Sequence, residues 1–266
     1  MLDIQNTKFL TESEIKERAK SIFTEKGAPG TSEKYAHIST KQIIDDMKVL
    51  SWEVVDAKQV RARKGDGYQK HLVVFRNPNL FIEGEDGDHV WPQILLTNSH
   101  DGKNAFTFTA GLFRMVCENG LVICSKEFEN LKIRHYGYDF EELQKVITTM
   151  VENLPLTVDS MNKFKKKQLR KKQVEEFAKK AAEIRFGVEQ VKNIKIDYSG
   201  LITPTRPEDA GNDLWSVFNV VQEKLTHGMF EYVSGTKLRK ARKIKNFRQD
   251  IDLNAKLYNL AMEYIA

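Results

Sequence analysis

The chain has 266 residues, of which 41% are hydrophobic and 30% are charged, and its net charge at pH 7 is +5. This length is sufficient to bury a large core, and the apolar runs are too short to cross a membrane. The first residues lack the basic and apolar regions of a secretory signal, and two cysteines cannot build a disulfide framework. We therefore expect a cytoplasmic globular protein without a membrane segment.

The first part of the chain, residues 1–158, carries signals for helices followed by strands. Capping-box patterns at Thr11–Glu14 and Ser39–Gln42 predict the starts of two helices. Alternating or continuous apolar residues then predict strands near residues 52–55, 69–76, 93–97 and 105–109.

The middle of the chain predicts a change back to helix. The segment Gly111–Gly120 has the pattern of a short helix that ends at glycine, and strands are expected at 121–124 and 131–135. Asp139 is expected to cap a helix that Pro155 ends. Because strands are grouped centrally with helices before and after, the predicted fold class is α+β, with a mostly antiparallel central sheet.

Residues 159–266 predict a basic, largely helical region packed on this core as one integrated unit. A long charged helix is expected over about 160–186, followed by a loop over 198–207. Asn212 or Asp213 can cap the next helix, which carries Trp215, and a last helix reaches the C-terminus.

The charges are distributed unevenly along the chain. Residues 160–248 contain 21 Lys and Arg against 10 Asp and Glu, a net charge of +11, whereas the remaining 21 basic and 27 acidic residues give −6. Two clusters dominate the basic part, Lys163–Lys172 and Lys237–Arg248. Such separation favours an anionic partner, most commonly nucleic-acid phosphate, although each cluster could instead be a solvated helix face.

The predicted phosphate-binding residues are the cationic side chains of these clusters and of a basic turn near residue 61: Arg61, Arg63, Lys64, Lys163, Lys165, Lys166, Lys167, Arg170, Lys171, Lys172, Lys237, Arg239, Lys240, Arg242, Lys243, Lys245 and Arg248. Phe164 and Phe247 lie among these cations. They could be platforms on which the bases of a single strand stack, or anchors that bury in the core.

Several segments carry a resemblance to a known family. Leu96–Gly102, Ala110–Val122, Glu208–Leu225 and the segment from Arg242 to Ala261 are similar to motifs of the plasmid- and prophage-encoded domain-of-unknown-function family 932. The resemblance implies a mobile-element setting in a bacterial host cell and no particular reaction. The matching motif residues are Asn98, His100, Asp101, Arg114, Cys117, Asn119 and Trp215. The chain departs from the pattern at Thr226–Glu231, where that family often carries an Arg-Gly-Gly-like sequence.

Catalytic signals are weak. His100 and Asp101 could form an acid–base pair, but Asn, Ser, Asp and Gly around them also suit a turn. Arg114 and Cys117 would share one helix face, with Cys117 either a nucleophile or a small buried residue. The cysteine and histidine spacing matches no metal site, and no glycine-rich phosphate loop is present. We therefore predict no metal or cofactor, and a role that is not enzymatic.

The leading hypothesis is a phage- or plasmid-encoded nucleic-acid-binding protein, with single-stranded DNA favoured, that acts in replication or recombination of a mobile element. One alternative is a factor that binds an acidic host protein involved in defence or replication. A second alternative is a hydrolase that uses His100 and Asp101. The sequence leaves open the strandedness of the nucleic acid and the oligomeric state.

Overall fold

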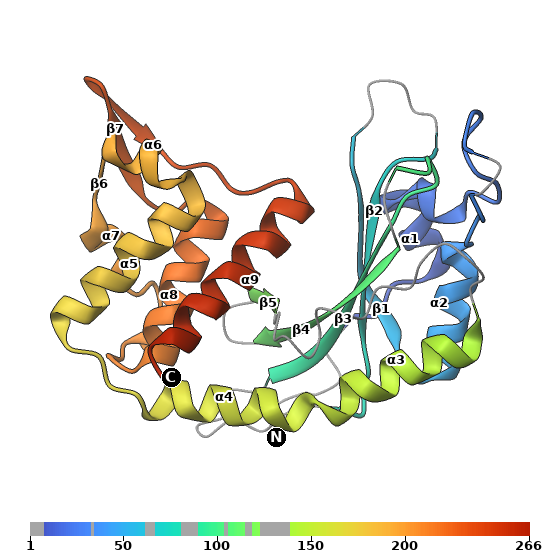
Figure 1. Ribbon diagram of the computed structural model, residues 1–266, viewed down its shortest axis with the longest axis horizontal. Helices are drawn as coiled ribbons and strands as arrows, with labels where there is room; N and C mark the ends of the chain where they lie inside the picture. The colour runs from blue at the N-terminus through green and yellow to red at the C-terminus, as the bar shows by residue number, and fades with distance from the viewer. Residues whose placement is uncertain are drawn as a thin grey trace. The chain divides into compact units, whose positions relative to one another are not determined.

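A computed structural model of the chain describes residues 8–32, 35–61, 67–80, 90–103, 106–114, 119–122 and 139–266. The fold is α+β, as the sequence predicts. The chain divides into two compact units (Figure 1): unit 1 comprises Met1–Gly120 and Ser125–Leu154, and unit 2 comprises Leu121–Cys124 and Pro155–Ala266. Within the described ranges, no helix is both long and apolar enough to cross a membrane.

Unit 1 is built on an antiparallel sheet whose strands follow sequence order. The strands are β1 (Glu53–Gln59), β2 (His71–Arg76), β3 (Val90–Asn98) and β4 (Thr107–Arg114). The strand order ends with β5 (Asn119–Val122), whose last two residues are assigned to unit 2. The register pairs Glu53 with Arg76, His71 with Asn98 and Thr97 with Thr107. All six residues of β2 are buried, so this strand lies at the centre of the core of unit 1. The strands predicted up to residue 109 are confirmed.

The helices of unit 1 begin where the sequence predicts. They are α1 (Glu12–Arg18), a 3₁₀ turn (Lys20–Phe23), α2 (Thr40–Val49) and α3 (Phe140–Glu152). Thr11 and Glu14 form the reciprocal capping box, and Ser39 accepts a hydrogen bond from the amide of Gln42 at the start of α2. Asp139 caps α3 through the amide of Glu141. These caps satisfy amides that have no partner inside the helix.

The predicted helix over Gly111–Gly120 is wrong. Residues 111–114 continue β4, where Gly111 pairs with Gln93 and Phe113 with Trp91, and the strand β5 begins at Asn119. The ladder to β3 satisfies the backbone of this segment, and such a distant partner overrides the local helical pattern. The strand predicted over 131–135 lies outside the described residues.

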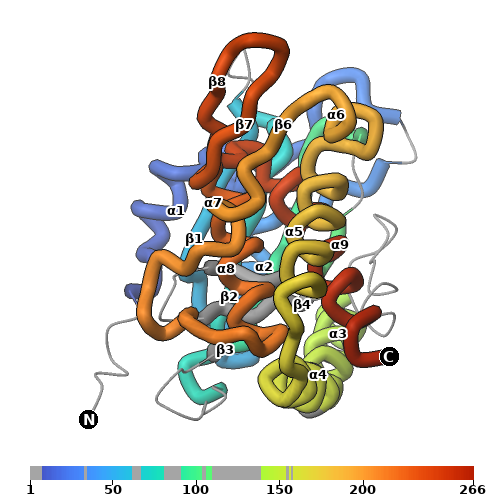
Figure 2. Tube along the Cα trace, turned by 90° about the vertical axis from the view of Figure 1, so that its left-hand side faces the viewer, coloured from blue at the N-terminus to red at the C-terminus, as the bar shows by residue number. Residues whose placement is uncertain are grey.

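Unit 2 is mainly helical but also contains a small antiparallel sheet of strand order β6-β7-β8. Its elements are α4 (Leu154–Lys166), α5 (Lys171–Phe186), α6 (Val188–Lys192), β6 (Ile194–Ile196), α7 (Tyr198–Ile202), a 3₁₀ turn (Pro207–Asp209), α8 (Leu214–His227), β7 (Glu231–Ser234), β8 (Lys237–Lys240) and α9 (Phe247–Glu263). Figure 2 shows α5 and α9 side by side. The core of unit 2 forms around α8, whose residues from Leu214 to Thr226 are all buried.

Four helical or loop predictions for this half need correction. Pro155 does not end a helix but lies in the first turn of α4, where its missing amide hydrogen costs nothing. The single helix predicted over 160–186 is two helices, α4 and α5, with a break at 167–170. The loop predicted over 198–207 contains α7, and residues 237–240 form a strand.

Candidate nucleic-acid interface

Seven cations surround the junction between α4 and α5. We call this group the lysine corner: Lys163, Lys165, Lys166, Lys167, Arg170, Lys171 and Lys172. All are exposed except Lys165, which is half-buried. Among the ion pairs of the described chain, one involves the corner, between Lys163 and Asp159 at 2.9 Å, and both of its side chains are mostly exposed. The corner therefore presents a dense positive charge with little internal compensation.

Two apolar side chains anchor the lysine corner to the core of unit 2. Phe164 is fully buried, and its ring centroid lies 6.2 Å from that of Phe218 and 5.8 Å from that of Tyr258. Leu169 is also buried. The hypothesis that Phe164 is an exposed stacking platform is therefore wrong, because its ring is packed against other aromatic rings. Instead, Phe164 and Leu169 fix the position of the cations on either side of them.

The backbone of the corner is also held by hydrogen bonds. The amide of Leu169 donates to the carbonyl of Asn212 over 2.8 Å, and the amide of Leu214 donates to the carbonyl of Lys167, also over 2.8 Å. Between these two bonds, Gln168 and Asp213 form an isolated antiparallel bridge. Segment 167–169 is thus tied to the start of α8, which explains why the chain breaks its helix here.

The start of α8 is itself stabilised by polar contacts. The carboxylate of Asp213 caps the helix by accepting from the amide of Ser216 at 3.0 Å and from its hydroxyl at 2.6 Å. A Cβ atom on Gly211 would lie 2.6 Å from that carboxylate, so the cap leaves no room for a side chain there. Trp215, two positions after Asp213, is buried. The family-like segment from Glu208 onward therefore has a structural role.

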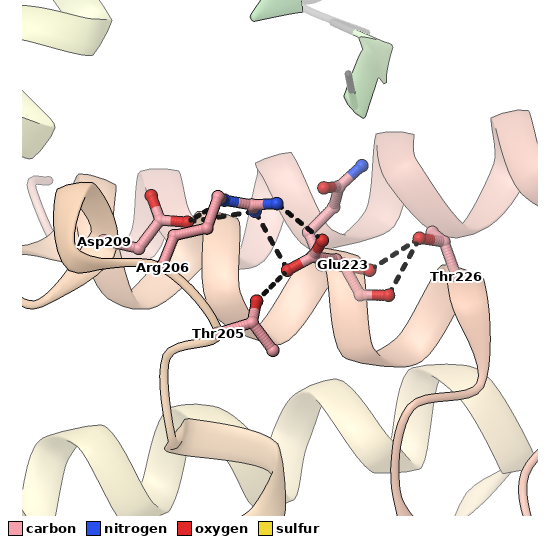
Figure 3. Close-up of polar contacts among 6 residues, drawn as sticks. Thr205, Arg206, Asp209, Glu223 and Thr226 are labelled. Atoms are coloured by element: carbon pink, nitrogen blue, oxygen red, sulfur yellow. Dashed lines mark hydrogen bonds and ion pairs between the residues drawn. The ribbon is translucent and has the colours of Figure 1, made fainter. Parts of the chain in front are cut away.

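A buried ion-pair network joins the same segment to the middle of α8 (Figure 3). The guanidinium of Arg206 donates to both carboxylate oxygens of Glu223, each at 2.9 Å, and also to Asp209 at 3.0 Å. The hydroxyl of Thr205 donates to Glu223 at 2.9 Å. Glu223 and Asp209 are buried, and about one fifth of the Arg206 side chain is exposed (22%). Sequence reasoning missed this network, because the charged residues of the segment do not show from their spacing that the Arg206 loop folds back onto α8.

The second cationic cluster begins on a hairpin that we call the ribbon, β7 and β8 with the turn Gly235–Thr236 between them. The pairing of Ser234 with Lys237 leaves a turn of two residues. All four residues of β8 are exposed, including Leu238, which has 65% of its surface accessible. The ribbon therefore presents the cations Lys237, Arg239 and Lys240 to solvent.

The remainder of the second cluster leads into α9. Its four cations are exposed: Arg242, Lys243, Lys245 and Arg248. Between them Ile244 and Phe247 are buried, so the interpretation of Phe247 as an exposed stacking platform is also wrong. The carbonyl of Arg242 accepts a hydrogen bond from Arg185, near the C-terminal end of α5, at 3.1 Å.

The two cationic clusters lie toward opposite ends of α5. The lysine corner is at the N-terminal end of this helix, whereas the ring of Phe186 at the other end contacts Phe230 and Tyr232 at the base of the ribbon. Sixteen helical residues span about 24 Å. Figure 2 shows the same arrangement, with α4 and β8 at opposite ends of α5. The clusters are thus two separate patches of unit 2, not the walls of one groove.

In unit 1, His100 and Asp101 take part in separate contacts. His100 is fully buried, with its ring centroid 4.6 Å from that of His37 and 5.1 Å from that of His71. The carboxylate of Asp101 accepts from the hydroxyl of Ser99 at 2.6 Å and from the amide of Lys103 at 3.1 Å, as is typical of a turn. This geometry favours the turn interpretation over an acid–base pair.

The buried ring of His71 is held by hydroxyl groups. The ring of His71 makes hydrogen bonds with Ser21 at 3.1 Å and Thr40 at 2.8 Å. Burial lowers the pKa of His71 to about 4. The amide of Asn98, another motif residue, donates to the hydroxyl of Thr40 at 3.0 Å. These residues therefore form a neutral polar core beneath the turn at Asp101.

Comparison with known proteins places both units in one family. The sequence profile of the family described as "Domain of unknown function (DUF932)" matches residues 30–258. The chain belongs to this family. It is 28% identical to the UPF0380 protein YfjQ and 27% identical to the UPF0380 protein YafZ, both of Escherichia coli K12, over 97% of this chain and 92% of each relative. No solved structure matches it.

The remaining motif and candidate residues of this DUF932 protein are scattered. Arg114 is the last residue of β4 and Asn119 is the first of β5. Arg61 is exposed just beyond β1, whereas Arg63, Lys64 and Cys117 lie outside the described residues. In the part of the chain that the structure describes, no group of three or more His, Cys, Asp or Glu side chains could hold a metal ion.

Proposed function

We propose that this DUF932 protein binds nucleic acid, with single-stranded DNA as the favoured form, and acts in replication or recombination of a mobile element in the bacterial cytoplasm. The observation that carries the proposal is the lysine corner, seven cations within ten residues on a rigidly anchored turn. Phosphate groups attract such a patch regardless of base sequence.

The charge pattern of the corner differs from that of a solvated helix face. Elsewhere in unit 2, three lysines pair with acids about one turn away: Lys180 with Glu176, Lys192 with Glu189, and Lys256 with Asp252. The corner has one such pair. In addition, the first turn of α5 contains Lys171 and Lys172 and no acid, which is opposite to the preference of the helix dipole. An anionic partner would relieve both unfavourable features.

The experiment measures the affinity of the full chain for a dye-labelled oligo-dT by fluorescence anisotropy over a range of salt concentrations. We expect the triple variant K165A/K166A/K167A to bind more weakly and to lose about 2 from the slope of log K against log salt, since each phosphate contact in a single strand contributes about 0.7. The matched control is K180A/K192A/K256A, which removes the same charge from lysines that are paired with acids.

The comparison separates local contact from overall charge. A control variant that retains the wild-type slope while the corner variant loses it supports the proposal. Equal weakening in the two variants would assign the effect to net charge and remove the corner from the interface. If the wild-type protein binds neither single-stranded nor duplex DNA at low salt and micromolar concentration, the proposed function is wrong.

A further inference from the structure

The ribbon presents a row of side chains on one face of the small sheet in unit 2. Leu238 pairs with Val233, and Val233 pairs with Lys195 of β6. Residues opposite each other in neighbouring strands point to the same face, and so does Lys240, two positions after Leu238. This face therefore carries an apolar pair with a lysine on either side.

The opposite face of the sheet is the one that packs on the helices. Tyr232 alternates with Val233 along β7, and its ring centroid lies 5.5 Å from that of Phe186 at the end of α5. Because neighbours along a strand point to opposite faces, Val233 and Leu238 are directed away from that contact. In agreement, Leu238 is 65% exposed, and Lys195 and Lys240 are also exposed.

The chemistry of this face restricts what it can bind. Lys195 and Lys240 supply positive charge on either side of the apolar pair, and the acid paired across the strands is Glu231, opposite Lys240. The cations Lys237 and Arg239 lie on the same strand. A ligand that suits this surface offers negative charge and an apolar face together. Unstacked nucleotides do so through their phosphates and their bases, whereas the bases of a duplex are covered by stacking.

We propose that the ribbon is a second contact site, at which Leu238 and Val233 pack against unstacked bases of a single strand while Lys195 and Lys240 contact its phosphates. The proposal rests on the proposed function and adds a second site, at which the bases themselves are contacted. The site lies about one length of α5 from the lysine corner, roughly 24 Å. One strand several nucleotides long can therefore contact both patches.

The test places a fluorescent probe at the proposed contact. The three tryptophans of the chain, Trp52, Trp91 and Trp215, are all buried. A Leu238→Trp variant therefore adds a single solvent-exposed indole, whose emission can be distinguished by iodide quenching. We expect saturating oligo-dT to quench this emission and to protect it from iodide, because bases stack on the indole.

A second measurement tests the native side chain. Leu238→Ala should weaken the binding of oligo-dT about five-fold, from the lost apolar contact, without changing the salt slope. K195A/K240A should reduce the salt slope by about 1.4. The matched controls are Val49→Trp and Val49→Ala, because Val49 is an exposed apolar residue of unit 1 with 75% of its surface accessible.

The outcomes distinguish this proposal from the function on which it rests. If oligo-dT binds, as anisotropy shows, but the emission of L238W responds no more than that of V49W, the ribbon proposal is overturned and the lysine corner remains the interface. A loss of duplex affinity in Leu238→Ala equal to the loss for oligo-dT would also overturn it. Failure of the wild-type protein to bind any DNA would overturn both proposals.

Discussion

The ion-pair network around Glu223 gives a sharp test of what stabilises unit 2. Its carboxylate is buried, with 7% of the side chain exposed, and accepts two hydrogen bonds from Arg206 and one from Thr205. The chain also contains an exposed pair, Glu189 with Lys192 at 2.7 Å, whose side chains are 85% and 64% accessible. Replacing each glutamate with alanine removes one carboxylate from an ion pair, and the two sites differ in burial.

The expected cost differs greatly between these two sites. Breaking a buried ion pair by removing one partner costs about 3–5 kcal/mol. In Glu223→Ala, Arg206 retains Asp209 and is partly solvated, so we expect a loss of about 2 kcal/mol in the free energy of unfolding. For a domain of this size this corresponds to a fall in Tm of about 10 °C. Glu189→Ala should cost less than about 0.5 kcal/mol.

The assay is thermal unfolding of the full chain by calorimetry, which resolves separate transitions if the two units unfold independently. The double variant R206A/E223A should be less stable than the single Glu223→Ala variant, because it also removes the ion-pair partner of the buried Asp209 carboxylate. A fall in Tm for Glu223→Ala no larger than for Glu189→Ala would refute the assignment of stability to this network.

Two further predictions concern buried groups of the fold. Burial lowers the pKa of His71 to about 4 in the folded protein. As the pH falls below about 6.5, the unfolded chain therefore takes up a proton at this histidine before the folded chain does. The free energy of unfolding should decrease by up to about 3 kcal/mol between about pH 6.5 and about pH 4. Urea unfolding at pH 7 and at pH 4.5 should show this loss in the wild-type protein and a smaller one in His71→Gln. Gly228→Ala should lower the free energy of unfolding by more than about 2 kcal/mol, since φ is +70° and the added Cβ would lie 2.5 Å from the backbone of Arg242. Gly235→Ala, with φ of +61° and open space around it, should cost about 1 kcal/mol in the same urea experiment, and equal costs at the two glycines would contradict the steric argument.

Local signals in the sequence predicted the elements whose ends are set by their own residues. Asp139 caps α3 and Asp213 caps α8. Both caps are predicted by the sequence, because each aspartate stands just before a segment with helical apolar periodicity. The errors occur where pairing with a distant segment determines the local secondary structure. Gly111–Arg114 is a strand because it pairs with β3, and the helix break at 167–169 exists because that backbone bonds to residues 212–214. No glycine or proline marks this break in the sequence.

In the candidate interface, too, local features could be predicted from the sequence and long-range packing could not. The sequence identified the cations themselves, because a run of charge is visible without a structure. It did not reveal that Phe164 and Phe247 are buried, since an aromatic residue among lysines fits both a stacking platform and a core anchor. It also missed the ribbon: Gly235-Thr236 suits a two-residue hairpin turn, but the lysines around it fit a basic helical region equally well.

The structure indicates what the family-like motif around the start of α8 would contribute to the proposed binding function. Asn212 and Leu214 contribute backbone hydrogen bonds, and Asp213 contributes the helix cap. Their effect is to hold segment 167–169 on the core, which fixes where the cations of the lysine corner point. A polyanion gains affinity from cations that are already in place, because less conformational entropy is lost on binding. The motif and the lysine corner, about forty residues apart in the chain, therefore form one structural element of unit 2, in which the motif holds the cations in position.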